Sequence, residues 1–207
     1  AQGHGARLPG VGGQAPACLA AAGARAMIAT AAGLITLRPL TLDDVTETYV
    51  GWLQDPEVTR YLMAGRTPQT ARTVRAFVET LLLSAARPFA ILLDGRHVGN
   101  TQLQQISGVD GTAEVGILLG DRTCWGQGIG QAAIQALETF ARCALDLRRL
   151  WAGTCNPACA GLFERCGWVR EGCQRAHVWF DDRWCDQWWY GRLATDRILL
   201  RVPGEGS

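Results

Sequence analysis

The chain has 207 residues, of which 48% are hydrophobic and 19% are charged. This is enough apolar material for the core of one compact domain, and it excludes a chain that is disordered throughout. With 20 basic and 19 acidic residues the formal net charge is +1 at pH 7, so overall charge gives no reason to expect binding to nucleic acid or to an anionic membrane. An anionic ligand has to be held by local geometry.

Residues 1–33 differ from the rest of the chain because Ala and Gly dominate them, with neither strand alternation nor strong helical patterning. Residues 17–33 are mildly apolar, but Arg25 interrupts them and they fall short of the ~20 residues that a membrane span needs. The order of regions in a signal peptide is also missing. We expect residues 1–33 to be a disordered or non-native extension, residues 34–195 a single domain, and residues 196–207 a flexible tail.

From residue 34 onward, hydrophobic periodicity and turn residues predict a regular succession of elements. The predicted strands are residues 34–40, 88–93, 97–106, 112–119, 149–154, 168–180 and 184–193. The predicted helices begin near residues 41, 67, 128 and 157, the third running to about 145 and the fourth to 166. Strands and helices mixed in this order predict an α/β domain with one central sheet and helices on both faces.

Residues 114–133 are the most informative segment, because a buried strand runs through a loop with Gly126, Gly128 and Gly130 into a helix. Alternating glycines let several backbone N–H groups converge on one oxygen-rich group, and the helix N-terminus adds partial positive charge. The segment lacks the Lys-Ser/Thr of a P-loop and the complete dinucleotide-binding fingerprint. It predicts a phosphate cradle without basic side chains, although an ordinary strand–helix turn is an alternative.

The sequence WGQGIGQA, from Trp125 to Ala132, resembles the pyrophosphate loop of the GNAT (general N-acetyltransferase) superfamily, Arg/Gln-x-x-Gly-x-Gly/Ala. Trp125 stands where Arg or Gln is usual, a variant associated with the ribosomal-protein N-terminal acetyltransferase-like branch. NPAC from Asn156 and FERCGW from Phe163 resemble the family's Asn-x-x-Ser and Gly-Phe segments. The resemblance covers residues 34–193. It implies a mostly antiparallel sheet with one splayed parallel pair of strands.

The resemblance also implies that acetyl-CoA is the co-substrate, with its pantetheine arm paired to backbone at the end of the 112–119 strand. A backbone N–H near residue 117 or 118 then meets the thioester oxygen. Asn156 anchors the pantetheine or the thiol, or caps a helix, or does both. The implied coenzyme-binding residues are Ile117, Leu118, Leu119, Trp125, Gly126, Gln127, Gly128, Ile129, Gly130, Gln131, Asn156 and Phe163.

The acceptor amine must be neutral to attack the thioester. Deprotonation at pH 7 costs about 4.6 kcal/mol for a lysine but only about 1 kcal/mol for an α-amino group. The resemblance implies Glu114 as the base, with a solvent-facing strand charge as the alternative, and His177 is a second candidate. Phe163 stands where many members have a Tyr acid and cannot donate a proton. Cys159 or solvent is therefore expected to protonate the leaving thiolate, unless Cys159 is simply packed.

In this family an acceptor is held between the first two helices, which here points to Trp52, Tyr61 and Arg66. Residues 48–62 and the HVGN turn at 97–100 resemble relatives that acetylate amino-sugar nucleotides. Six aromatic residues near the C-terminus could be core, a dimer contact, or a wall that stacks a sugar or base: Trp179, Phe180, Trp184, Trp188, Trp189 and Tyr190.

We therefore expect an N-acetyltransferase that modifies a primary amine of a small molecule, an amino sugar or a nucleotide-linked amino sugar. The alternatives are a protein N-terminal or antibiotic acetyltransferase and a non-catalytic acyl-CoA-binding module, the last supported by Phe163. We expect no nucleic-acid or membrane partner, and a monomer or homodimer. Eight cysteines without a CxxC pair favour reduced thiols, a cytoplasmic location and no metal.

Overall fold

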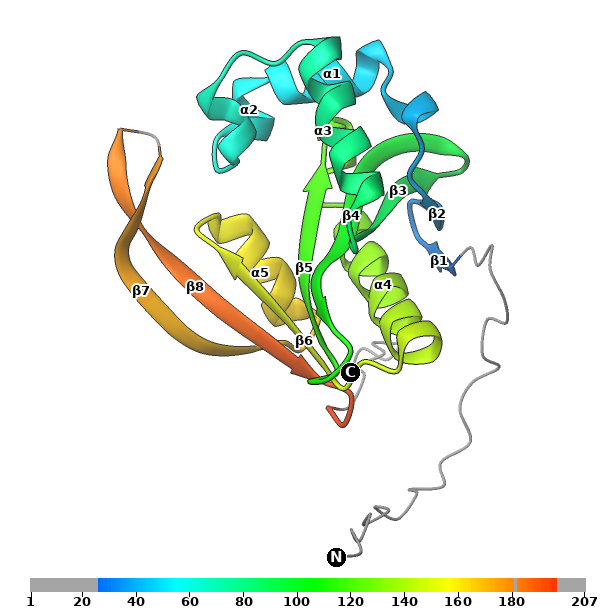
Figure 1. The fold of residues 1–207 in the computed structure, drawn as a ribbon, viewed down its shortest axis with the longest axis vertical. Coiled ribbons are helices and arrows are strands. Elements are labelled where there is room, and N and C mark those ends of the chain that lie inside the picture. Colours follow the sequence, from blue (N-terminus) through cyan, green and yellow to red (C-terminus); the bar gives the residue numbers. More distant parts are fainter. Residues whose placement is uncertain (1–25, 181, 197–207) are drawn as a thin grey trace, which may run out of the picture.

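The computed structural model describes residues 26–180 and 182–196 and builds them around one eight-stranded sheet (Figure 1). The strands are β1 (Ala26–Thr30), β2 (Gly33–Pro39), β3 (Arg87–Leu93), β4 (Arg96–Ser107), β5 (Thr112–Leu119), β6 (Arg149–Thr154), β7 (Val169–Phe180) and β8 (Arg183–Leu193). The α-helices are α1 (Glu47–Gln54), α2 (Pro56–Thr59), α3 (Ala71–Leu83), α4 (Ile129–Leu145) and α5 (Pro157–Arg165). Short 3-10 helices are η1 (Leu42–Asp44), η2 (Met63–Arg66) and η3 (Arg122–Cys124).

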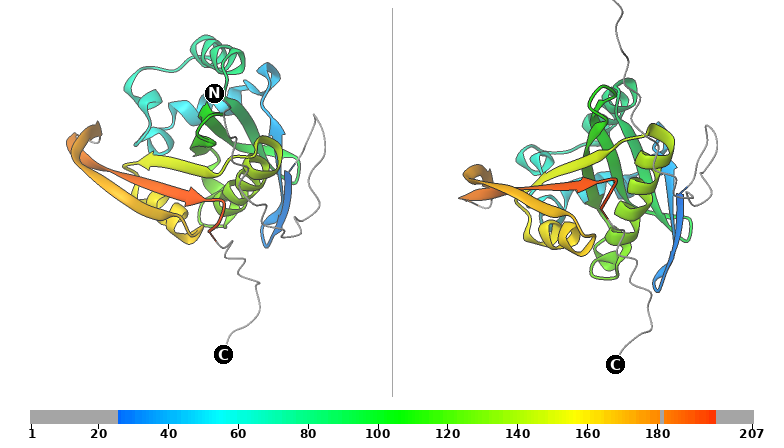
Figure 2. Two further views of the ribbon diagram at one scale, coloured as in Figure 1. Left: turned by 60° about the horizontal axis from the view of Figure 1, so that its bottom comes forward. Right: turned by 90° about the horizontal axis from the view of Figure 1, so that it is seen from below.

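The strand order across the sheet is β1-β2-β3-β4-β5-β6-β8-β7. β5 and β6 form its parallel pair, and the other neighbouring strands are antiparallel. β1 therefore lies at one edge and the β7–β8 hairpin projects at the other (Figure 2). The expected α/β domain with one mixed sheet is confirmed.

The N-terminal boundary expected at residue 34 is wrong, because residues 26–30 form β1 and pair with β2 from Ala26–Leu37 to Thr30–Gly33. The turn between the strands is Ala31-Ala32, which carries no Asn, Asp or Pro signal. Gly33, at φ +135°, gives the turn its unusual backbone, and the Thr30 hydroxyl donates to Gly33 O at 2.8 Å. Residues 1–25 and 197–207 lie outside the described residues.

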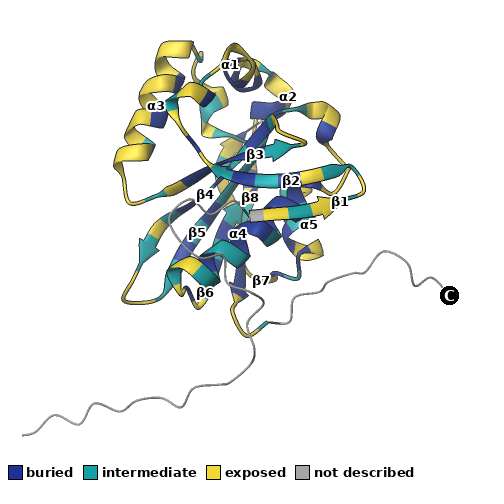
Figure 3. Cartoon of the chain, turned by 90° about the vertical axis from the view of Figure 1, so that its right-hand side faces the viewer, coloured by how far each residue is buried: buried dark blue, intermediate teal, exposed yellow. Residues whose placement is uncertain are grey.

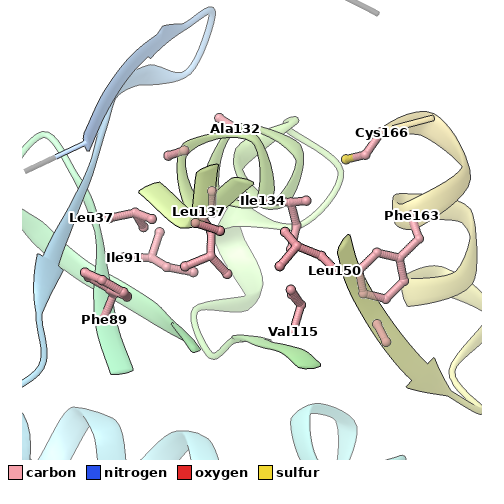
Figure 4. Packing of buried hydrophobic residues seen from close by; sticks show 14 of the residues in the cluster. Leu37, Phe89, Ile91, Val115, Ala132, Ile134, Leu137, Leu150, Phe163 and Cys166 are labelled. Atoms are coloured by element: carbon pink, nitrogen blue, oxygen red, sulfur yellow. The ribbon is translucent and has the colours of Figure 1, made fainter. Parts of the chain in front are cut away.

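Alternation along the strands distributes the core between the two faces of the sheet. Ala113 and Val115 of β5 join the main cluster under α4 and α5, whereas Leu118 packs into a second cluster with α1 and α3. Figure 4 shows Ile134 and Leu137 of α4 beside sheet residues of the main cluster. The central strands are largely buried and α3 is mostly exposed on its outer side (Figure 3).

The parallel pair is short. β5 and β6 align only at Thr112–Arg149, Ala113–Leu150 and Glu114–Trp151, and beyond these residues the strands diverge (Figure 1). The expected splayed pair is therefore present. The remainder of β5 pairs with β4 alone, and the remainder of β6 pairs with β8 alone.

A buried polar group links α4 to the second half of the sheet. Glu138 of α4 is 3% exposed and accepts a hydrogen bond from the Trp168 indole at 2.6 Å. Its other oxygen lies 3.7 Å from Nε of Arg192 on β8, which is also 3% exposed. Burial raises the pKa of the Glu138 carboxyl, while the Trp168 hydrogen bond and the Arg192 charge act in the opposite direction.

Glu138→Leu should lower the free energy of unfolding by roughly 3 kcal/mol or more, because it removes the carboxylate that faces a buried guanidinium. Urea unfolding of the whole chain measures the loss. Glu79→Leu is the control, since Glu79 pairs with Arg75 one turn away on exposed α3 and should change stability by less than about 0.5 kcal/mol. Equal losses in the two variants would contradict a structural role for Glu138.

Candidate active site

The gap between β5 and β6 exposes backbone groups of β5. The Gly120 N–H donates to Val98 O at 3.0 Å, and two positions earlier Leu118 stands opposite Asn100 of β4. Antiparallel pairing alternates, so Leu118 turns its backbone toward β4, whereas Ile117 and Leu119 turn theirs toward the gap. Of the three residues expected to pair with pantetheine, Ile117 and Leu119 are suitably oriented and Leu118 is not.

The glycine loop joins this gap to the start of α4. Gly126 (φ +74°) and Gly128 (φ +80°) adopt left-handed conformations, and a Cβ at either position would meet nothing within 4 Å. Gly130 has a different reason to be glycine, because its Cβ would lie 3.2 Å from Leu162 and 3.3 Å from Leu119. The loop therefore has open space beside Gly126 and Gly128, and it is tightly packed at Gly130, where α4 begins.

Gly128 is the N-cap of α4 and has no side chain to cap the helix. The first intrahelical bond runs from the Ala132 N–H to Gly128 O at 3.0 Å. The N–H groups of Ile129, Gly130 and Gln131 precede it, so they have no acceptor within the helix. Gln127 is held within the loop by its side chain, which donates to Thr123 O. These converging amides can hold an anion.

Trp125 braces the loop, because its indole N–H donates to Leu119 O at 3.0 Å, while the residue as a whole remains 41% exposed. The Arg122 guanidinium lies 5.7 Å from the centre of this ring and 3.4 Å from the Asp55 carboxylate. A cation therefore stands beside the loop although Trp125 replaces the usual Arg or Gln. The sequence reasoning missed Arg122, whose only signal is its place three residues before Trp125.

Glu114 stands at the point where β5 and β6 part, on the face of the sheet opposite α4, and is half-buried. Its Oε2 accepts hydrogen bonds from Nε2 of Gln104 at 2.9 Å and from Nε2 of Gln105 at 2.7 Å. The alternative expectation, a charge on the strand that simply faces solvent, is therefore incomplete, because Glu114 is half-buried and bound by two side chains. Neither glutamine was singled out from the sequence.

Further side chains share this face with Glu114. The pairings of Glu114 with Trp151 and of Gly153 with Trp189 put all four on one side. The two indole rings lie 5.5 Å apart, and a Cβ on Gly153 would be 2.7 Å from Gln187 Nε2 and 2.8 Å from the Trp189 ring. We call the set Glu114, Trp151, Gly153, Gln187 and Trp189 the Glu114 face.

The structure brings Tyr61 and Arg66 against the end of the β7–β8 hairpin. Arg66 donates to Trp179 O at 2.9 Å and lies 4.7 Å from the centre of the Phe180 ring, and Tyr61 packs on the same ring. Phe180 belongs to a small buried cluster with Cys155, two residues beyond Gly153. Tyr61 and Arg66 therefore border the far end of the Glu114 face.

Two expected contact residues are core residues instead. Trp52 is 7% exposed, packs its ring 5.0 Å from that of His97, and fills the space beside Gly120. Phe163 is 2% exposed and stacks on Tyr190. The expectations that Trp52 contacts the acceptor and that Phe163 contacts the coenzyme are corrected accordingly, because both rings face the interior.

The remaining predicted residues differ in how well they suit their roles. Burial raises the pKa of the Cys159 thiol to about 11, so it is a weaker acid than an ordinary thiol at about 8.5. His177 is exposed on β7, and two strands, β8 and β6, separate β7 from β5. Asn156 is the N-cap of α5, accepting from the Ala158 N–H at 2.9 Å.

Within residues 26–180 and 182–196, no group of three or more His, Cys, Asp or Glu side chains could hold a metal ion. The cysteines of this part of the chain are not joined in disulfide bonds: Cys124, Cys143, Cys155, Cys159, Cys166, Cys173 and Cys185. No helix in the described residues is long and apolar enough to cross a membrane.

Known proteins resemble the chain in sequence and in fold. The acetyltransferase (GNAT) domain family matches residues 35–169. "Uncharacterized N-acetyltransferase p20" of Bacillus licheniformis is 33% identical over 125 residues, 57% of this chain and 68% of p20. Mycobacterium smegmatis RimJ, in complex with CoA-disulfide, has a TM-score of 0.74 at 21% identity, covering 82% of this chain and 87% of RimJ. RimL, a ribosomal L7/L12 alpha-N-protein acetyltransferase in complex with coenzyme A, has a TM-score of 0.72 at 20% identity, covering 81% and 97%.

Gly120→Ala should destabilise the protein by about 1–3 kcal/mol, because the new Cβ would lie 2.0 Å from Trp52 Cδ2 and overpack the end of β5. Thermal unfolding followed by circular dichroism measures the change. Gly108→Ala is the matched control, since its Cβ meets nothing within 4 Å, and it should alter stability by less than about 1 kcal/mol. A Gly120→Ala protein as stable as the control would contradict the packing of Trp52 against this turn.

Proposed function

The chain belongs to the acetyltransferase (GNAT) domain family, and from this premise we propose that it transfers the acetyl group of acetyl-CoA to a primary amine of an amino sugar or a nucleotide-linked amino sugar. Membership makes the chain an acetyltransferase enzyme, so a non-catalytic acyl-CoA-binding module is set aside. The choice of acceptor rests on the residues of the Glu114 face, where two indole rings lie next to the Glu114 carboxylate.

We infer that acetyl-CoA occupies the gap between β5 and β6. Its pyrophosphate accepts hydrogen bonds from the amides of residues 129–131, with the Arg122 guanidinium nearby. Its pantetheine arm pairs with backbone of Ile117 and Leu119, and the Ile117 N–H stabilises the oxyanion that develops on the thioester oxygen. Asn156 uses its Oδ1 as the cap of α5, which leaves its amide nitrogen to bind the pantetheine.

In the proposed reaction the amine nitrogen attacks the thioester carbon from the Glu114 face. Glu114 takes one proton from the nitrogen, the tetrahedral intermediate collapses, and the C–S bond breaks. Coenzyme A leaves as a thiolate and takes a proton from solvent. Cys159 is a poor donor because its pKa is raised to about 11, and Phe163 has no proton to give. The side chains around the leaving group therefore favour solvent as the acid.

The Glu114 face supports a sugar as the acceptor. Trp151 and Trp189 offer aromatic surface against which a pyranose ring can pack, and the Gln187 amide can bond with hydroxyl groups. The face carries one carboxylate, and the acidic Glu171 beside it is already bound by Arg149 at 2.7 Å. A polyamine with several positive charges would find one partner there, so a singly charged amine fits better.

Peptide N-termini form the second candidate class. RimL, which shares the fold, is named as an alpha-N-protein acetyltransferase. An α-amino group needs about 1 kcal/mol for deprotonation at pH 7, so one carboxylate base can serve it as well as an amino sugar. The Glu114 face favours the sugar because its two indole rings lie next to the base.

Glu114→Gln should lower kcat/KM about 100-fold or more for the preferred acceptor, because the amide cannot accept the proton. Acetyl-CoA affinity should stay unchanged. A thiol-release assay on glucosamine, a nucleotide-linked amino sugar, a peptide with a free N-terminus and spermidine measures turnover, with Glu79→Gln as the control. Undiminished turnover in Glu114→Gln would reject Glu114 as the base. A preference for the peptide would select the second candidate class.

Gly128→Asp should bind acetyl-CoA at least tenfold more weakly than Gly128→Asn. Asn and Asp both adopt the left-handed backbone more readily than most residues and have nearly the same shape, but only Asp places a negative charge beside the pyrophosphate. Isothermal titration calorimetry gives both dissociation constants. Equal affinities would show that the loop amides do not hold the pyrophosphate.

A further inference from the structure

We propose that Gln104 and Gln105 are positioning residues, which hold the Glu114 carboxylate in the orientation from which it accepts the proton of the acceptor amine. This inference rests on the proposed role of Glu114 as the base. Gln104 and Gln105 lie on β4, the strand next to the β5 strand that carries Glu114, and they act only through Glu114.

Both glutamine side chains bind the same carboxylate oxygen. Nε2 of Gln104 and Nε2 of Gln105 lie 2.9 Å and 2.7 Å from Oε2 of Glu114. Among the hydrogen bonds of the described residues, those to the Glu114 side chain end on Oε2, which leaves Oε1 to receive a proton. Two donors on one oxygen restrict rotation of the carboxylate, so Oε1 keeps a fixed direction.

The network has a fixed polarity. An ionised carboxylate only accepts hydrogen bonds, so Gln104 must turn its NH₂ group to Glu114 and its carbonyl oxygen away. That carbonyl oxygen accepts from Nε2 of Gln102 at 2.9 Å. Gly116 makes room for this partner, since a Cβ there would lie 3.3 Å from Gln102 Cγ and Nε2. The chain from Gln102 through Gln104 to Glu114 therefore runs in one direction.

A β-bulge explains how two consecutive residues reach one carboxylate. In a regular strand, the side chains of Gln104 and Gln105 would point to opposite faces of the sheet. The register between β4 and β5 shifts between Gln104 and Ser107, and Gln105 adopts a left-handed backbone with φ +49°. The bulge turns both side chains toward Glu114. A non-glycine residue in this conformation is a local strain that the surrounding sheet has to sustain.

The test is a double-mutant cycle that separates positioning from stability. Gln104→Leu and Gln105→Gly each remove one donor, and glycine keeps the left-handed backbone of residue 105 without strain. Each is made singly and together, in the natural chain and in the Glu114→Gln background. We expect kcat to fall about tenfold for each single variant and about 100-fold for the pair, with KM for acetyl-CoA unchanged. In the Glu114→Gln background the same changes should have no further effect on kcat.

Ser107→Ala is the matched control, because Ser107 lies at the same bulged end of β4 and, among the described residues, its hydroxyl bonds to Asp110 of its own turn and not to Glu114. It should keep the natural kcat. Losses of equal size in both backgrounds would mean that the glutamines serve the fold alone and would overturn the proposal, as would natural kcat in all three glutamine variants. If Gln104→Leu fails to fold, Gln105→Gly alone decides. Natural activity in Glu114→Gln itself would instead refute the proposed base, a distinct outcome.

Discussion

The divergence of β5 and β6 after three paired residues is the constraint on which the rest of the site depends. A sheet that opens in its middle leaves backbone groups of Ile117 and Leu119 without a neighbouring strand on one side. The loop and the N-terminus of α4 lie at the open end of the same strand, so unpaired amides from two elements collect in one region. No basic side chain is needed to build such a region, which agrees with a chain of nearly balanced charge.

An opened sheet needs other contacts to keep its halves together, and the structure supplies them on both faces. On one face α4 packs against strands from both halves, and buried Glu138 faces Trp168 and Arg192. On the other face Arg66 binds the backbone of the hairpin at Trp179. These contacts therefore join the two halves of the sheet on both faces, and none of them involves the backbone of Ile117 or Leu119 in the gap.

Local sequence patterns predict the elements whose residue types carry a turn, strand or helix signal. The other features depend on tertiary packing, which local patterns do not reveal. The glycines of the loop and the strand before it could be recognised, because a left-handed backbone and a helix start leave residue-type signals. β1 could not, since Ala31-Ala32 is an unusual turn and Gly33 alone marks it. The family resemblance implies ligand contacts for Trp52, from its place between the first two helices, and for Phe163, from the family's Tyr position. Aromatic residues suit both a core and a site, and only packing shows that these two belong to the core. The bulge at Gln105 leaves no periodic signal at all.

Because side chains and main-chain groups alternate in direction along β5, the proposed coenzyme site is built from main-chain groups and the proposed acceptor site from side chains. Main-chain groups of Ile117 and Leu119, together with the helix amides, are directed at the coenzyme in the proposed reaction, whereas side chains such as Glu114, Trp151 and Trp189 are directed at the acceptor. Main-chain donors survive almost any substitution, but side chains change with every one. A lineage built on this strand can therefore exchange one amine for another over evolutionary time while its supply of activated acetyl groups stays the same.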